Sequence, residues 1–256
     1  MCIKALGYII IDTQQPDAWK NFAENVVGLM PAAHSTDDGA LYYKMDAYTW
    51  RLCIRRADTE KLAVAGWEVE TPKDFLAVCD KLKASGIAFT LADTDWCHRR
   101  GVQSLLSVTD PSGAQLEIFC KMKLDYLRFN SPVGVGGFVT GYHGDMGLGH
   151  FVIPTAAFGE TFRFYTQVLG FGETDYMHFQ FSPAPNDPGQ GLHFLHAKSP
   201  RHHSLALFQD PNPPTHGCVH LMFEVANMDE VGYFMDRCRD HQVPVVSSLG
   251  RHTNDL

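Results

Sequence analysis

Two stretches decide how this chain folds: residues 5–11 read ALGYIII and residues 147–153 read GLGHFVI. Each is a short apolar run of the kind that forms a buried strand. The second run repeats the pattern of the first 142 residues later, and a helical pattern closed by a glycine follows each one. We expect these helices over Pro16–Val27 before Gly28, and from an N-cap at Thr155 to Leu169 before Gly170. The sequence therefore predicts a duplicated folding unit.

A second match extends the repeat within each half. Residues Gly66–Val69 align with Met222–Val225, and each is a predicted strand followed by a predicted helix, Lys73–Ser85 or Asp229–His241. The first half then ends in a predicted hairpin, whereas the second half stops before its hairpin. A strand, a helix and several strands, repeated four times, predict an α+β fold whose sheets curl around a cavity and carry helices outside. We expect the function inside such a half-barrel.

The division between the halves falls in a segment rich in proline and glycine. With 256 residues, the chain exceeds the usual size of one core, so two domains are expected. Residues 121–141 contain Pro132 and a glycine cluster, which is typical of a linker. We therefore predict a non-catalytic domain over residues 1–134 and a catalytic domain over residues 135–256.

The composition is that of a globular protein and excludes several function classes. Hydrophobic residues make up 45% of the chain, and charged residues 20%. The net charge of −8 supplies no basic field for nucleic acid or anionic membranes. Seven scattered cysteines without a CxxC pair fit a reducing cytoplasm, and no apolar run approaches membrane-spanning length. We expect a cytoplasmic protein with no nucleic-acid or membrane partner, and homo-oligomerisation as a common state of large soluble enzymes.

Histidine is distributed very unevenly. Of 13 histidines, eleven fall in the last 114 residues. Imidazole is the commonest side-chain metal ligand and a common proton carrier near neutral pH. Most of these histidines could be surface or packing residues, but the second half is where the chemistry is expected.

Two of these histidines stand at positions related by the repeat. His150 lies on the first strand of the third unit and His220 on the first strand of the fourth, and their counterparts in the first half are Tyr8 and Val64. Either histidine alone could simply pack on its strand. Because matching strands of paired units meet across the cavity, the pair together indicates a metal site in the second half only.

Iron(II) and manganese(II) favour a carboxylate beside two histidines, and such a site leaves positions open for substrate and dioxygen. Val64 and Glu117 are 53 residues apart in the first half, so the corresponding carboxylate would fall at position 273, beyond Leu256. Glu224 is the nearest carboxylate along the chain to His220, but its counterpart Glu68 indicates a structural role. The third ligand, a carboxylate, is therefore expected outside the given sequence.

Two further histidines are candidates for proton transfer or substrate contact. The segment that begins at Arg201 is predicted as an alternating strand in which His203 faces the cavity with Leu205. A neutral imidazole in that place could accept a phenolic proton and return it. After a predicted strand over Val243–Val246, a polar loop carries His252, which could hydrogen-bond a substrate oxygen.

Four short motifs give the chain a family resemblance, and the linker phrase FVTG at residues 138–141 agrees with them. Residues 147–150 read GLGH, 200–206 read PRHHSLA, 219–225 read VHLMFEV and 249–255 read LGRHTND. In this order they resemble the type I extradiol catechol dioxygenases, most closely the 2,3-dihydroxybiphenyl 1,2-dioxygenase group and its steroid-catechol relatives. The resemblance covers the whole chain.

This resemblance implies the vicinal oxygen chelate fold, with four βαβββ modules in two half-barrel domains, the last one incomplete here, and Fe(II) in the second domain. His150 and His220 match the histidine ligands, and His203 matches the acid–base histidine. The other matches concern the substrate: His252 contacts it, Asn254 and Asp255 support its catechol end, and Phe194 forms an aromatic wall for its distal ring.

The implied reaction is cleavage of a catechol ring beside its two hydroxyls by dioxygen, in the degradation of aromatic compounds. The family pattern continues with a tyrosine and the glutamate ligand, and the given sequence ends before both, so we expect a fragment of a longer product. The alternatives are an inactive truncated relative, a metal-free ligand-binding protein, and a glyoxalase-like or isomerase-like enzyme of the same fold. Which catechol is preferred is left open, although the aromatic residues favour a bicyclic or larger one.

Overall fold

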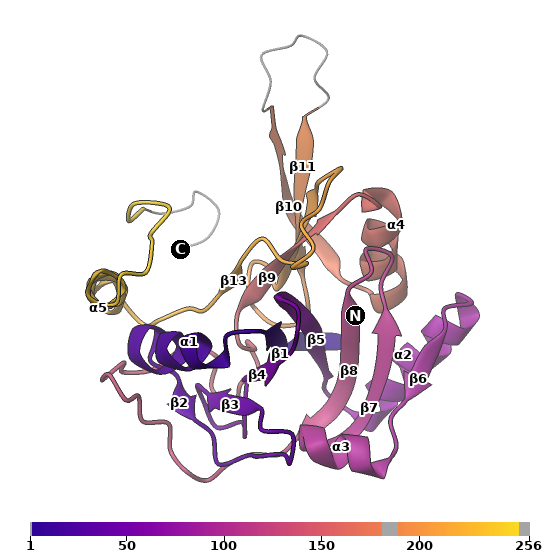
Figure 1. Cartoon of the computed structure of the whole chain (residues 1–256). Helices are drawn as coiled ribbons and strands as arrows, with labels where there is room; N and C mark the ends of the chain where they lie inside the picture. Colours follow the sequence, from indigo (N-terminus) through magenta and orange to yellow (C-terminus); the bar gives the residue numbers. More distant parts are fainter. Residues whose placement is uncertain (1, 181–188, 251–256) are drawn as a thin grey trace.

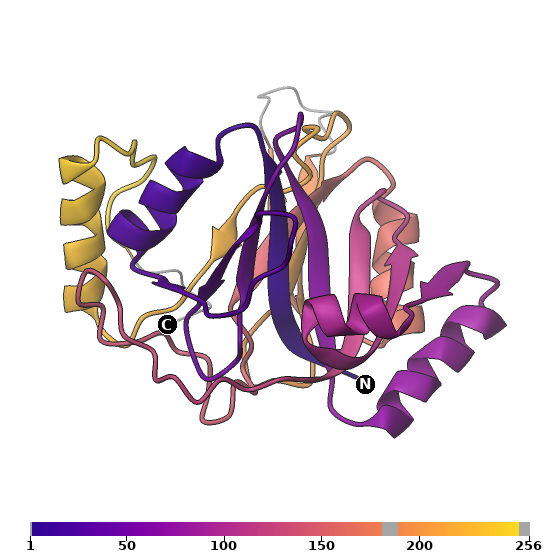
Figure 2. The same ribbon diagram turned by 60° about the horizontal axis from the view of Figure 1, so that its bottom comes forward.

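The structure is a computed structural model that describes residues 2–180 and 189–250 (Figure 1). Its strands form two sheets, and its helices lie outside them (Figures 1 and 2). None of the helices in these two ranges is long and apolar enough to cross a lipid bilayer. The mixed α+β architecture agrees with the fold class that the repeat predicts.

The first sheet has eight strands in the order β2-β3-β4-β1-β5-β8-β7-β6. Its strands are β1 (Ile3–Thr13), β2 (Met30–Pro31), β3 (Leu41–Lys44), β4 (Leu52–Arg56), β5 (Lys61–Val69), β6 (Phe89–Leu91), β7 (Val102–Thr109) and β8 (Gln115–Met122). Its helices are α1 (Pro16–Asn21), the π-helix η1 (Phe22–Val27), α2 (Pro72–Ala84) and α3 (Thr94–Arg100). Two strand–helix–three-strand modules thus join through the antiparallel pair β1–β5.

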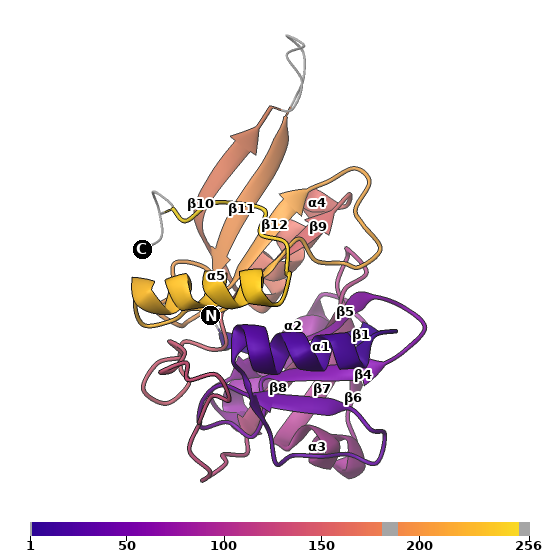
Figure 3. The same ribbon diagram turned by 60° about the vertical axis from the view of Figure 1, so that its left-hand side comes forward.

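The second sheet has five strands in the order β10-β11-β12-β9-β13. Its strands are β9 (His150–Thr155), β10 (Gly172–Phe179), β11 (Gln190–His196), β12 (Leu205–Gln209) and β13 (Leu221–Met222). Its helices are α4 (Phe158–Arg163), the π-helix η2 (Phe164–Leu169) and α5 (Met228–Asp240), and Figure 3 shows α5 alongside α1. The β10–β11 hairpin projects away from the rest of the molecule (Figure 1).

Strand pairing confirms the internal repeat residue by residue. Tyr8 of β1 is paired with Gly66 of β5, and His150 of β9 is paired with Met222 of β13. The first module of each sheet shows the same register: Ile10 of β1 pairs with Cys53 of β4, and Val152 of β9 pairs with Ala206 of β12. Positions related by the repeat therefore occupy equivalent places in the two sheets.

Several predicted element bounds are wrong for local reasons. Thr155 does not cap the later helix, because it is still in β9, and Ala157 holds the cap position. The predicted strand over Met222–Val225 ends at Met222, and Val243–Val246 forms no strand. The strand expected from Arg201 begins only at Leu205. Each of the two first helices ends in a π-helical turn that a left-handed glycine closes.

The two sheets share one core and several polar contacts. Trp67 of β5 packs its ring edge-on against Phe171, with ring centroids 4.9 Å apart, and lies 5.9 Å from Phe151 of β9. The buried Tyr165 hydroxyl donates a hydrogen bond of 2.8 Å to Asp110 in the β7–β8 turn. Apolar burial across this contact contributes roughly 25 cal/mol for each Å² removed from water. The two halves are therefore packed together rather than merely linked.

Gly149 lies where β9 and β13 approach most closely. Its φ of +151° belongs to a region that L side chains rarely adopt, and an added Cβ would lie 1.8 Å from the Met222 carbonyl oxygen. We predict that Gly149→Ala lowers the free energy of unfolding by about 2–4 kcal/mol, since it combines backbone strain with a clash against backbone. Urea unfolding measures this effect.

Gly159 is the matched control for this prediction. It lies in α4, and an added Cβ would meet only the Arg163 guanidinium at an ordinary 3.5 Å. Gly159→Ala should raise stability by about 0.5–1 kcal/mol. Equal effects of the two substitutions would contradict the close approach at Gly149.

Candidate active site

The two histidines singled out by the repeat converge. His150 is the first residue of β9 and is buried, and His220 immediately precedes β13. Their Nε2 atoms are 3.1 Å apart. The backbone fixes this approach, because the Val152 amide donates to the His220 carbonyl at 3.1 Å and the Val219 amide donates to the Val152 carbonyl at 2.9 Å. The side chains therefore meet as a result of strand pairing.

This spacing fits two ligands of one metal ion. Two imidazole nitrogens about 2.1 Å from one ion and at right angles to each other are about 3.0 Å apart. Imidazole is a good ligand for divalent iron, and an arrangement with two histidines leaves coordination positions for other groups. His150 and His220 are therefore the residues of this site that could hold a metal.

His203 lies beside this pair, on the loop that precedes β12. Its side chain is buried, and its ring centroid is 4.0 Å from that of His150. Its Nδ1 atom is 3.0 Å from Nδ1 of His202, which is only partly buried. The inward direction predicted for His203 is thus what the structure shows, although the residue is not part of a strand.

Phe194 closes one side of the histidine cluster. It is 8% exposed, and its ring centroid is 4.8 Å from that of His203 in an edge-on arrangement. Val152 and Ala206 are buried with it, and Leu192 and Phe208 pack against them. An apolar wall beside polar imidazoles suits the distal part of an aromatic ligand.

A third metal ligand is not found in the described part of the chain. Within residues 2–180 and 189–250, no group of three histidine, cysteine, aspartate or glutamate side chains could hold a metal ion. Glu224 lies after the end of β13 and forms an ion pair with Arg201, which agrees with the structural role that its counterpart Glu68 indicates. His252, Asn254 and Asp255 lie outside the described residues.

The first sheet holds a repeat-related copy of the cluster built from different side chains. Tyr8 stands where His150 stands, and Trp50 and Tyr42 correspond to His203 and Phe194 by the register of their strands. The distances match: the Tyr8 and Trp50 rings are 4.4 Å apart and the Tyr42 and Trp50 rings 5.2 Å. Aromatic packing thus fills the place that the imidazoles take in the second sheet.

Glu117 completes this first cluster. Its buried carboxylate accepts a hydrogen bond from the Tyr8 hydroxyl and two from Arg100, at 2.8 and 2.9 Å. Burial, reinforced by the Glu117 charge, raises the pKa of Tyr8 well above its ordinary value, so the hydroxyl stays protonated and donates. The salt bridge from Arg100 and the hydrogen bond from Tyr8 thus engage the carboxylate of Glu117, which a metal ion would need free.

A cavity of about 970 Å³ lies on the first domain, away from the histidine cluster. Its lining includes His34, His98, Lys121 and Lys123. This cavity is therefore separate from the histidine cluster of the second sheet.

Arg201 is a residue beside the histidine cluster to which the sequence assigns no role. In the sequence it stands only in a motif and at the start of a predicted strand, yet its buried side chain contacts three segments near the histidines. The signal in the sequence is an arginine directly before a histidine pair at a predicted strand start. A buried guanidinium needs several acceptors, so an arginine in such a place is expected to bond to neighbouring segments.

Comparisons with known proteins agree with this geometry. A model of the Glyoxalase/Bleomycin resistance protein/Dioxygenase superfamily matches residues 147–256, and one of the Dihydroxybiphenyl dioxygenase BphC D1 family matches residues 6–56. An iron-dependent extradiol dioxygenase of Rhodococcus jostii is 38% identical over the whole chain, which covers 84% of that protein. A biphenyl-2,3-diol 1,2-dioxygenase of Paraburkholderia xenovorans is also 38% identical, with 82% of its length covered.

Solved structures give the same result. A crystal structure of a catechol 2,3-dioxygenase has a TM-score of 0.89 and 30% identity, with 99% of this chain and 86% of that chain covered. Together with the two sheets, these likenesses establish the vicinal oxygen chelate fold and an oxidoreductase. The chain belongs to the family of extradiol ring-cleaving dioxygenases.

The copy in the first sheet generates a prediction about stability. Tyr8→Phe removes one donor from the buried Glu117 carboxylate, and we expect it to lower the free energy of unfolding by about 1–2 kcal/mol. Turnover per bound iron should stay within twofold of the unsubstituted protein, because Tyr8 belongs to the other sheet.

The exposed Tyr126 provides the control, and Tyr126→Phe should change stability by less than about 0.5 kcal/mol. Urea unfolding and steady-state assays measure both quantities. A large loss of turnover with unchanged stability in Tyr8→Phe would contradict the assignment of the first cluster to structure.

Proposed function

We propose that this protein opens the ring of a bicyclic catechol, such as 2,3-dihydroxybiphenyl, beside its two hydroxyls, with dioxygen and with Fe(II) held by His150 and His220. The observation that carries the proposal is the 3.1 Å separation of the Nε2 atoms of His150 and His220. The names of the relatives, which include iron-dependent and biphenyl-2,3-diol dioxygenases, support the metal and the substrate class.

The third ligand in this proposal is a glutamate at the position that Glu117 has in the first sheet. Glu117 of β8 is paired with Gly66 of β5, and its carboxylate reaches the Tyr8 hydroxyl. Because Tyr8 and His150 are equivalent, a carboxylate on the corresponding strand would reach the metal. The sequence repeat puts that residue beyond Leu256.

When bound, Fe(II) supplies a Lewis-acidic centre at which a catechol and dioxygen can be brought together. His203 then acts on the proton of a catechol hydroxyl: it accepts this proton as the substrate binds and returns it during ring opening. The buried position of its imidazole beside His150 supports this role, since a general base must lie within hydrogen-bond reach of the reacting hydroxyl.

The apolar residues around Phe194 hold the second ring of the substrate. Phe194 can place an aromatic edge against that ring, and the neighbouring aliphatic side chains exclude water from it. We assign His252 to a substrate oxygen and Asn254 and Asp255 to the catechol end, as the family motif predicts.

Three other expectations also stay predictions. The division near residue 135 is supported by the run between β8 and β9, which contains no helix or strand of the structure. Homo-oligomerisation and a cytoplasmic location rest on the sequence alone.

Replacement of a histidine ligand tests the metal assignment. We expect His220→Ala, prepared anaerobically with Fe(II), to lose at least about 90% of the bound iron and the matching share of turnover, because second-shell losses alone cost 10–100-fold in metal affinity. Iron analysis and oxygen uptake on addition of 2,3-dihydroxybiphenyl measure these effects. His216→Ala, an exposed histidine on the loop before His220, is the control and should retain both.

Unchanged iron content in His220→Ala would overturn the ligand assignment. Iron binding without oxygen uptake in the unsubstituted protein would instead favour a glyoxalase-like or isomerase-like reaction. Absence of metal binding would favour a ligand-binding protein.

His203→Gln tests the acid–base role. The variant should keep its iron, since His203 is not a proposed ligand, while kcat falls by about 10²-fold. Iron analysis combined with steady-state kinetics separates the two effects. Loss of iron together with activity would show that His203 is a ligand and that its role has been misassigned.

A further inference from the structure

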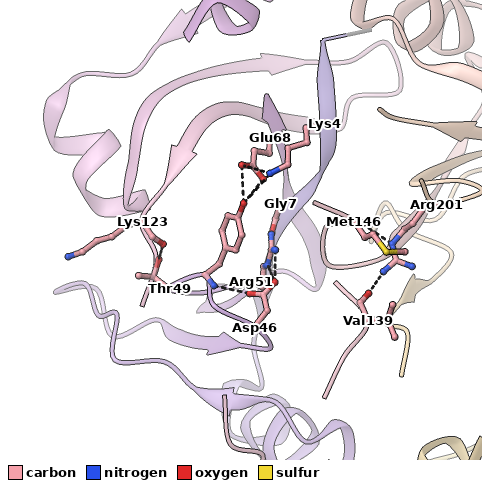
Figure 4. Close-up of polar contacts among 11 residues, drawn as sticks. Lys4, Gly7, Asp46, Thr49, Arg51, Glu68, Lys123, Val139, Met146 and Arg201 are labelled. Atoms are coloured by element: carbon pink, nitrogen blue, oxygen red, sulfur yellow. Dashed lines mark hydrogen bonds and ion pairs between the residues drawn. The ribbon is translucent and has the colours of Figure 1, made fainter. Parts of the chain in front are cut away.

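We propose that Arg201 is the positioning residue that holds His203 against the metal-binding histidines, a proposal that rests on the acid–base role of His203. The side chain of Arg201 is 4% exposed. Its Nε donates to the Met146 carbonyl at 2.9 Å, a second guanidinium nitrogen donates to the Val139 carbonyl, and a third pairs with Glu224. Figure 4 shows the guanidinium between Met146 and Val139.

These three partners belong to the segments that carry the other histidines. Met146 lies four residues before His150, and Glu224 lies four residues after His220. The segment of Val139 is attached to the same place, since its amide donates to the Glu224 carbonyl at 2.8 Å. One guanidinium therefore connects the chain before His150, the chain after His220 and the loop of His203.

The rest of this loop is fixed mainly at its two ends. The amides of Lys198 and Ser199 donate to carbonyls of β1, and the Ser204 amide donates to the Leu195 carbonyl at 2.9 Å. In between, the Thr174 hydroxyl donates to the His202 carbonyl at 2.7 Å. Arg201 is the residue of this middle part whose side chain reaches the segments before His150 and after His220.

The equivalent position in the first sheet supports a role specific to the site. By the register of β4, Tyr48 stands there. Its hydroxyl donates to Glu68, the counterpart of Glu224, at 3.0 Å. Lys4 also binds Glu68, at 3.1 Å (Figure 4). A tyrosine has a single hydroxyl, so Tyr48 can bind the carboxylate but not two carbonyls as well. A guanidinium has five donors in a rigid fork and can bind a carboxylate and two carbonyls together.

Iron and Arg201 have different effects on the three histidines. A bound ion holds His150 and His220 in place by itself, because both are proposed ligands. His203 is not a ligand, so its distance from the substrate depends on its loop. A displacement of about 1 Å in a catalytic group can cost about 10²-fold in rate. Loss of Arg201 should therefore reduce kcat rather than iron content.

The test is a double-mutant cycle between Arg201 and His203. We expect Arg201→Met to lower kcat by about 10- to 100-fold with iron content unchanged. In a His203→Gln background, the same substitution should cause less than a twofold further loss, because residues that act through one another are not additive. Arg239→Met, on the exposed face of α5, is the matched control and should leave kcat unchanged.

A chemical rescue keeps the proposal testable if Arg201→Met folds poorly. Added ethylguanidinium should restore part of the kcat of Arg201→Ala, and Arg201→Lys should remain impaired because an ammonium lacks the planar fork. Rescue would support positioning by the guanidinium.

Three results would overturn the proposal. An unchanged kcat in Arg201→Met, or an equal loss of kcat in both backgrounds, would show that Arg201 has only a structural role or none, while the function proposed for His203 would stand. An unchanged kcat in His203→Gln would remove the acid–base role itself, and the positioning role with it.

Discussion

The antiparallel pairing between the first strands of successive modules is the constraint on which the rest of this structure depends. It joins β1 to β5 and β9 to β13, and it decides which side chains meet inside each sheet. Because side chains alternate along a strand, a shift of one residue in the β9–β13 register would turn one histidine of the pair outward. The 3.1 Å approach of His150 and His220 is therefore a property of backbone register. The close approach of Gly149 to the Met222 carbonyl makes that register tight.

The same scaffold is used in two ways. In the first sheet, Tyr8, Trp50 and Phe119 pack together, and a salt bridge satisfies the buried Glu117. In the second sheet, His150 and His203 take the places of Tyr8 and Trp50, so imidazole nitrogens stand where the first sheet has aromatic packing. Equivalent positions of the two sheets thus hold aromatic packing in one sheet and a histidine cluster in the other.

Much of the fold and part of the site could be predicted from the sequence, because both follow from the repeat. The alignment of Tyr8 with His150 is confirmed by strand pairing, and the helices of the second and fourth modules lie within one residue of their predicted ends. The errors arise where a local pattern competes with tertiary contacts. The strand expected from Arg201 starts later because the arginine side chain bonds other segments and holds the chain in a loop. Met222–Val225 reads as a full strand, yet the segment after Met222 turns away to pair with the chain near Phe138. Side-chain bonds between distant segments leave no periodic signal, so the contacts of Arg201 do not follow from the hydrophobic pattern, and only its place before a histidine pair marks it.

Strand β1 serves both halves of the molecule. Inside the first sheet it lies between β4 and β5, and its main-chain oxygens also receive hydrogen bonds from outside that sheet: Ile3 and Lys4 from the amides of Lys198 and Ser199, and Leu6 from that of Leu148. The loop of His203 thus uses acceptors that belong to the first half of the chain. The second half expressed separately, or grafted onto the first half of a distant relative, would lose this main-chain template. The two halves are consequently exchangeable among relatives only where the path of that one strand is preserved.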